Sequence, residues 1–225
     1  AEVAGASLSL LRSLLDKSLL TSPSPGRLGL HQLISGLLRN RLEDLRIDRS
    51  GLEEAHAHFY LTPLMPESLG GLPQSEIPRR LSAELANVRS AWHTAVDRRW
   101  SRTLSGAVSG FRRLFDSLGM FRSGFELLME AFEAVRAEDP LAGARLESEA
   151  GWMALRQTRY DQAISFADSA LSVLQEHGDD SDVVGCMLTR LSALKRLGRL
   201  REARELADRA LRLVERVDSP RLYAT

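Results

Sequence analysis

The chain is 225 residues long and carries 30 basic and 30 acidic residues, so its formal net charge at neutral pH is zero. This length allows a substantial core or an elongated repeat array, and the charge balance excludes an overall attraction to nucleic acid or anionic membranes. Its one cysteine, Cys186, excludes an internal disulfide. No run of about 18 apolar residues is present, so we expect no membrane-spanning helix and a cytoplasmic location.

The N-terminal region, residues 1–47, is predicted to form a helix, a hairpin and a second helix. Leucines from Leu8 to Leu15 have helical spacing, and two short apolar segments, residues 17–21 and 27–30, flank a Pro-Ser-Pro-Gly turn. The second helix is predicted at about residues 31–45. Residues 48–79 are predicted to hold a connecting helix, followed by a loop rich in proline and glycine.

The remaining region, residues 80–225, contains an internal repeat. Residues 160–171 recur as residues 200–211, and a weaker copy begins at Phe121, 39 residues before Tyr160. The matched positions are Ala163, Ala167, Ala170 and Leu171 with Ala203, Ala207, Ala210 and Leu211. Alanines at i, i+4 and i+7 lie on one stripe of a helix and let a neighbouring helix approach closely. Gly119 and Gly198 precede two of the copies, as expected of residues that end a helix. The sequence therefore predicts an all-α array of helix–turn–helix units.

This order of small and large residues resembles the tetratricopeptide repeat, whose small residues stand at the eighth, twentieth and twenty-seventh positions of the unit. Gly151, Ala163 and Ala170 fit these positions. The eighth position is Leu191 in the next unit and Arg112 in the earliest, so the match is closer in the second helix of each pair. The resemblance implies a tetratricopeptide-like superhelix.

The motifs before the repeats resemble STAND-class signalling ATPases, including the large bacterial transcriptional regulators related to the maltose activator. Residues 14–20, LLDKSLL, and 26–42, GRLGLHQLISGLLRNRL, are similar to the end of their winged-helix segment. Residues 81–92, LSAELANVRSAW, are similar to a later helix, with Ala86 where the family usually has aspartate. The resemblance implies a winged-helix hairpin here and an ATPase domain upstream, since this chain has no G-x-x-x-x-G-K-[ST] loop.

No combination of residues predicts catalysis, a cofactor or a metal site in this chain. His56 and His58 diverge by about 200° on a helix of roughly 3.6 residues per turn, and no further ligand is close in sequence. His31, His93 and His177 are isolated. We therefore expect no enzyme activity from this chain.

The tetratricopeptide resemblance also implies a concave groove lined by the first helix of each unit. Its predicted residues on two adjacent units are Arg145, Ser148, Trp152, Arg156, Leu188, Ser192, Lys195 and Arg196. The four cations predict a basic groove beside one aromatic ring, which would favour carboxylates or phosphates. The alternative is that these cations are solvated and paired with nearby acidic residues.

Two classes of function fit these patterns. The first is a sensor or scaffold region of a STAND-type regulator, which binds a protein segment, another domain of its own chain or an anionic small-molecule inducer. The alternative is a free-standing tetratricopeptide adaptor that holds a peptide or helix. Direct nucleic-acid binding is not expected, because the predicted hairpin carries only Lys17 and Arg27 as nearby cations. These are too few to contact a row of phosphates.

The terminal unit is predicted to expose an apolar face. Ser219 and Pro220 have the form of a helix start, yet only five residues follow them. We expect the chain to stop within a unit, which favours self-association through the uncovered face.

The alanine stripe generates a stability prediction. Ala163→Leu or Ala203→Leu should lower the free energy of unfolding by about 1 to 3 kcal/mol, because a close helix contact has no room for a larger side chain. Thermal unfolding measures the effect, and unchanged melting of both variants would place the stripe in solvent.

Overall fold

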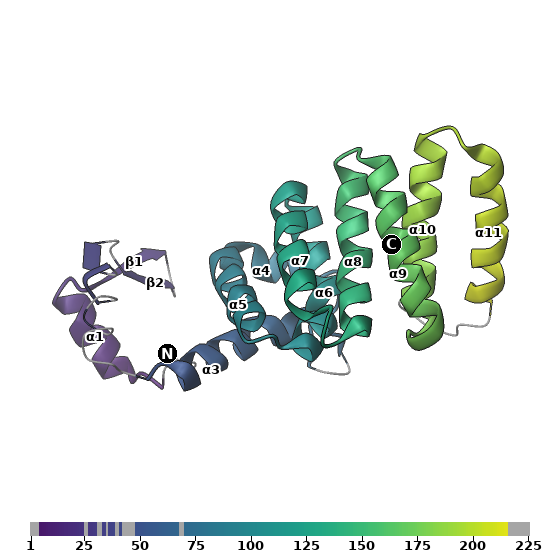
Figure 1. The fold of residues 1–225 in the computed structure, drawn as a ribbon. Helices are drawn as coiled ribbons and strands as arrows, with labels where there is room; N and C mark the ends of the chain where they lie inside the picture. The colour runs from purple at the N-terminus through teal and green to yellow at the C-terminus, as the bar shows by residue number, and fades with distance from the viewer. Residues whose placement is uncertain are drawn as a thin grey trace. The chain divides into compact units, whose positions relative to one another are not determined.

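The computed structural model of the chain describes residues 5–24, 27–30, 33–34, 36–38, 41, 48–67 and 70–215. The chain divides into two compact units, Ala1–Phe59 and Tyr60–Thr225, with the boundary inside the predicted connecting segment 48–79. The described residues are mostly helical, which confirms the predicted all-α class (Figure 1).

The described part of the first unit contains a helix followed by two antiparallel strands. Helix α1 (Leu8–Asp16) is capped by Ser7, whose Oγ accepts a hydrogen bond from the backbone N–H of Leu10. Strands β1 (Leu20–Ser24) and β2 (Arg27–Leu30) pair with Leu20 opposite Leu30. β1 starts at Leu20 rather than at residue 17, because Ser18, with a φ of 56°, closes the end of α1. Most of the helix predicted at residues 31–45 lies outside the described residues.

The described residues of the second unit form helices that follow α3 (Ser50–Leu61). Its first elements are η1 (Thr62–Leu64), α4 (Ile77–Leu81), η3 (Ser82–Glu84) and α5 (Leu85–Asp97). The longer helices are α6 (Ser101–Ser117), α7 (Phe121–Val135), α8 (Pro140–Arg156), α9 (Tyr160–His177), α10 (Asp180–Arg196) and α11 (Leu200–Val214). The predicted helix start at residues 219–220 lies outside the described residues.

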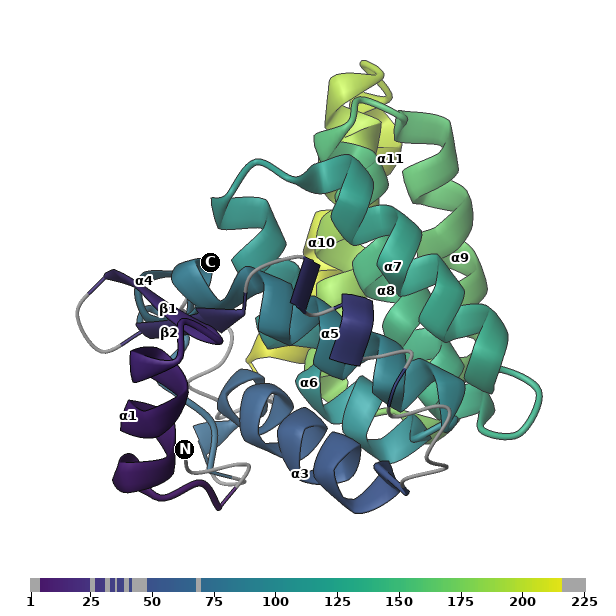
Figure 2. The same ribbon diagram turned by 90° about the vertical axis from the view of Figure 1, so that its left-hand side faces the viewer.

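Each long helix from α6 to α11 packs against the next one along the chain. In addition, α6 contacts α8, and α8 contacts α10. Figure 1 shows α8 to α11 standing side by side in chain order, and Figure 2 views the same succession from one end. The first helices of successive pairs therefore lie next to one another.

One type of turn ends the first helix of three successive pairs. After α6, α8 and α10, the residue in the left-handed region is Gly119 (φ 67°), Thr158 (φ 62°) and Gly198 (φ 73°). In each turn the following N–H bonds a carbonyl five residues earlier, as from Arg159 to Ala154 at 3.0 Å. This Schellman pattern satisfies the last carbonyl groups of a helix. The same turn therefore forms at Thr158, although the sequence has no glycine there.

The core of the second unit combines an aromatic stack with the repeated alanines. Trp92 stacks on Phe111 with 3.8 Å between ring centroids, and Phe111 stacks on Phe115 at 4.4 Å. All three rings are buried, and Trp92 Nε1 donates a hydrogen bond to the Leu127 carbonyl oxygen at 3.1 Å. Ala163 and Ala203 are buried too, as close packing of their helices requires.

Gly110 on α6 lies directly against the backbone of Leu64 in η1. A Cβ at Gly110 would stand 2.9 Å from the carbonyl carbon of Leu64, whereas a Cβ at Gly106 would meet nothing within 4 Å. The two glycines are one turn apart on the same helix. Alanine substitution at each glycine therefore separates the effect of the close contact with Leu64 from the general effect of replacing a glycine within a helix.

Gly110→Ala should lower the free energy of unfolding by about 1 to 3 kcal/mol, because the opposing atoms belong to the backbone and cannot rotate aside. Gly106→Ala is the matched control and should raise it by about 0.5 to 1 kcal/mol, since alanine loses less backbone entropy on folding. Urea unfolding followed by circular dichroism measures both. Equal effects of the two substitutions would show that α6 does not rest on η1.

Candidate functional site

The predicted groove residues divide between α8 and α10, which contact each other. Arg145 of α8 is half-buried, and its Nε lies 2.7 Å from Asp182 Oδ2 at the start of α10. A second carboxylate, on Asp179, lies 3.7 Å from Arg145 Nη2. Burial raises the pKa of Asp182, and the hydrogen bond and charge of Arg145 oppose that rise. Arg145 therefore ties two helices together, and its positive charge is offset.

Ser148 also faces α10 and bonds to a buried thiol. The Sγ of Cys186 donates a hydrogen bond to Ser148 Oγ at 2.9 Å. Burial raises the pKa of Cys186 to about 12. A thiol held in this state is neutral at physiological pH and inert as a nucleophile. Ser148 thus belongs to the contact between α8 and α10.

Trp152 stands at the centre of a cluster formed by α6 and α8. We call it the Trp152 cluster, and its members are Arg112, Asp116, Glu149, Trp152 and Arg156. Trp152 Nε1 donates a hydrogen bond to Asp116 Oδ2 at 3.3 Å, and the Arg112 guanidinium lies 5.1 Å from the centre of the Trp152 ring. A cation over an indole face is an attractive contact that also fixes the ring. The ring is only half-buried, so part of it stays accessible.

The charges of the Trp152 cluster balance one another. Arg112 Nε lies 2.8 Å from Glu149 Oε2, and Arg156 Nε lies 2.9 Å from Asp116 Oδ1. Neither contact has the direction of a hydrogen bond, although Arg112 Nε and Asp116 Oδ1 are shielded from solvent. These are ion pairs of imperfect geometry, which leaves their polar atoms incompletely satisfied.

Two of the four predicted groove cations are therefore paired with acidic residues, as in the alternative interpretation. Asp182 offsets Arg145 and Asp116 offsets Arg156, so the predicted surface keeps fewer uncompensated cations than its composition suggests. The reason is that first helices of neighbouring pairs lie close enough for their side chains to pair. Lys195 and Arg196 are exposed, and neither forms an ion pair within the described ranges. Leu188 and Ser192 are half-buried on α10.

The acidic members of the Trp152 cluster were not among the predicted groove residues. Asp116 stands 39 residues before Leu155, the spacing that separates Phe121 from Tyr160. Leu155 directly precedes the groove residue Arg156, so extending the groove to its neighbours and one unit back along the repeat would have pointed to Asp116 on α6. Glu149 follows Ser148 directly and had no such signal, because its role depends on the approach of Arg112 from another helix.

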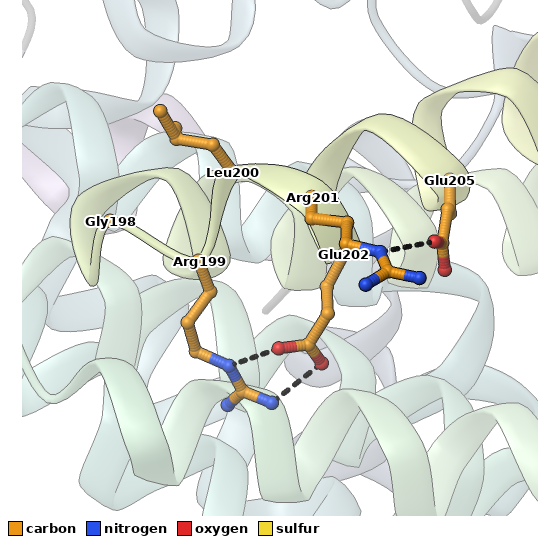
Figure 3. A pocket seen from close by; sticks show the side chains of 6 residues that line it. All are labelled: Gly198, Arg199, Leu200, Arg201, Glu202 and Glu205. Carbon is orange, nitrogen blue, oxygen red and sulfur yellow. Dashed lines mark hydrogen bonds and ion pairs between the residues drawn. The ribbon is translucent and has the colours of Figure 1, made fainter.

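A shallow hollow of 550 Å³ lies at the start of α11, away from the Trp152 cluster. It is lined by Gly198, Arg199, Leu200, Arg201, Glu202 and Glu205 (Figure 3). Its charged groups bond to one another: Arg199 Nε and Nη2 each lie 2.7 Å from an oxygen of Glu202. This pairing raises the pKa of Arg199 and lowers that of Glu202. The hollow therefore has no converging set of unpaired polar groups for a ligand.

The described parts of the chain contain no group of three or more histidine, cysteine or acidic residues that could hold a metal ion. Within those parts, no helix has the length and apolar character needed to cross a membrane. No protein-family model matches the chain, and none of the curated proteins compared with it is similar to it.

The burial of Cys186 predicts slow thiol labelling. The pKa of Cys186 is about 12 in the folded chain, against an ordinary value of 9.0. At pH 8 the folded chain therefore holds roughly 1000-fold less thiolate than the unfolded chain, and alkylation by iodoacetamide should be slower by about that factor. The rate should still rise with pH beyond pH 9, because the thiol remains mostly protonated there. Labelling of the folded protein at the unfolded rate would show that α8 and α10 do not pack around Cys186.

Proposed function

We propose that this chain is the binding arm of a STAND-type signalling or transcriptional regulator, built as a tetratricopeptide-like superhelix with a winged-helix hairpin at its N-terminus. The observation that carries the proposal is the same Schellman turn after α6, α8 and α10, combined with the contacts of α8 with α6 and with α10. Stacked helix pairs present their first helices as one row, the kind of surface on which helical repeats bind partners.

The Trp152 cluster supplies the anchor for a bound segment. Asp116 and Arg112 already hold the indole ring, so its ordering costs little when a partner binds. A partly exposed tryptophan in a supported position is the type of residue that contributes most to protein–protein affinity. A partner carboxylate can also accept hydrogen bonds from the guanidinium of Arg156, whose side chain is 47% exposed.

Lys195 and Arg196 give the surface its preference for acidic partners. They are exposed at the end of α10, on the helix that packs beside α8. Their charge speeds encounter with an acidic segment or an anionic small-molecule inducer, and this effect weakens with salt. The partner class that fits best is a protein segment with an apolar or aromatic residue beside carboxylates.

A free-standing tetratricopeptide adaptor is the second candidate. It would use the same surface but would have no reason to carry motifs similar to the end of a winged helix, such as LLDKSLL at residues 14–20. The STAND proposal places this arm in a longer cytoplasmic chain with its own ATPase domain. On that view the present residues bind and transmit, and they perform no catalysis or cofactor chemistry.

The test is selection of peptides from a displayed random library on the purified chain. Enriched peptides should carry carboxylates beside an apolar residue, and Trp152→Ala should weaken their binding at least about tenfold, as expected for an interface anchor. Lys195→Glu combined with Arg196→Glu should abolish binding at low salt. Fluorescence anisotropy with labelled peptides measures these changes.

Arg201→Glu is the matched control, because Arg201 is an exposed arginine of α11 outside this surface. It should leave peptide affinity unchanged. Peptides that bind all the variants equally would place the binding site elsewhere and refute the proposed role of α6, α8 and α10.

A further inference from the structure

Helix α11 presents an apolar stripe that the described elements cover only in part. We call Leu200, Ala207, Leu211 and Val214 the α11 stripe. Leu200 is 66% exposed and Leu211 is 60% exposed, compared with 37% for Leu118 and Leu197 at the ends of α6 and α10. In Figure 3, Leu200 points away from the Arg199–Glu202 pair. The stripe is thus separate from the charged hollow beside it.

The same positions on α9 are covered by the next helix. Forty residues earlier, the stripe corresponds to Tyr160, Ala167, Leu171 and Leu174. Leu171 is 8% exposed and Leu174 is 1% exposed, because both pack in a core with Val183 and Met187 of α10. The other end of α10 packs at the start of α9, where Ala193 meets Ala163. The covering helix therefore runs antiparallel to the helix it covers.

A charge pair completes the α9–α10 contact. Arg190 Nε of α10 lies 2.9 Å from Asp168 Oδ1 of α9. Asp208 on α11 repeats Asp168 at the same spacing of forty residues. Within the described ranges Asp208 has no ion pair. α11 thus keeps the acidic half of a contact whose basic half comes from a covering helix.

One position differs between α9 and α11, and the difference favours a helix docked on α11. Arg204 stands on α11 where Ile164 stands on α9. An antiparallel covering helix would bring its C-terminal end near this residue, as α10 brings Ala193 near Ala163. A cation near the carbonyl end of a helix is favourable because of the helix dipole.

We propose that the α11 stripe is a docking site for an amphipathic helix of the α10 type. The helix lies antiparallel to α11, covers Leu211 and Val214 with apolar residues near its start, and places an arginine opposite Asp208. The site lies on α11 and does not depend on the proposed binding surface of α6, α8 and α10. A substitution on one surface therefore tests that surface alone.

The probe is a labelled peptide with the sequence of residues 179–197 and Cys186→Ser. It should bind the chain saturably in fluorescence anisotropy, and Leu211→Glu should weaken binding at least about tenfold, as for removal of a central anchor. Asp208→Arg should also weaken it, and the peptide variant Arg190→Asp should restore affinity for Asp208→Arg only. Leu118→Glu is the control, since Leu118 is an exposed leucine at the end of α6.

A second measurement is needed because a short free peptide forms little helix on its own. The same peptide sequence, joined after Thr225 by a flexible linker, acts at high effective concentration and should raise the melting temperature. That rise should vanish when the fusion carries Leu211→Glu. A fusion that melts like the parent chain overturns the proposal. So does sedimentation that shows a dimer dissociated by Leu211→Glu, because a second copy would then occupy the stripe.

Discussion

The close approach of helices at small side chains is the constraint on which the second unit depends. A Cβ on Gly151 would lie 3.2 Å from the Cβ of Phe166, and one on Gly124 would lie 3.0 Å from the Cβ of Phe115. Because interiors are densely packed, the smallest side chain at each crossing sets the spacing between helices. Ala163 and Ala203, the repeats of Gly124, are buried in the same way. This spacing lets first helices of successive pairs touch.

That contact decides the electrostatics of the candidate surface. Cationic side chains of one first helix pair with carboxylates on the neighbouring one, as Arg145 pairs with Asp182 and Arg156 with Asp116. The pairs hold the row of first helices together and fix Trp152 in its orientation. Recognition on such a surface depends more on the aromatic anchor and on the exposed Lys195 and Arg196 than on a general positive field.

Helices α9 and α11 share a repeated sequence but lie in different environments. On α9, Leu171 and Leu174 form part of the core, whereas Leu211, which matches Leu171, is exposed on α11. An aspartate stands at both positions 168 and 208, and among the described residues only Asp168 has an ion-pair partner on the neighbouring helix. The sequence of one unit therefore indicates what its neighbour must supply, because each helix contributes half of the residues at their interface.

Periodicity in the sequence was enough to predict the all-α class, the small side chains buried at Ala163 and Ala203 and the turns at Gly119 and Gly198. These features depend on local spacing and on the conformational freedom of glycine, which a single stretch of chain reveals. The sequence did not reveal the turn at Thr158, whose left-handed conformation is imposed by the helices on either side. Nor could it reveal that Asp182 and Asp116 would pair with Arg145 and Arg156 of the predicted groove. Ion pairs between residues about 37 to 40 positions apart form only when packing brings their helices together, so tertiary structure alone decided the charge of the surface.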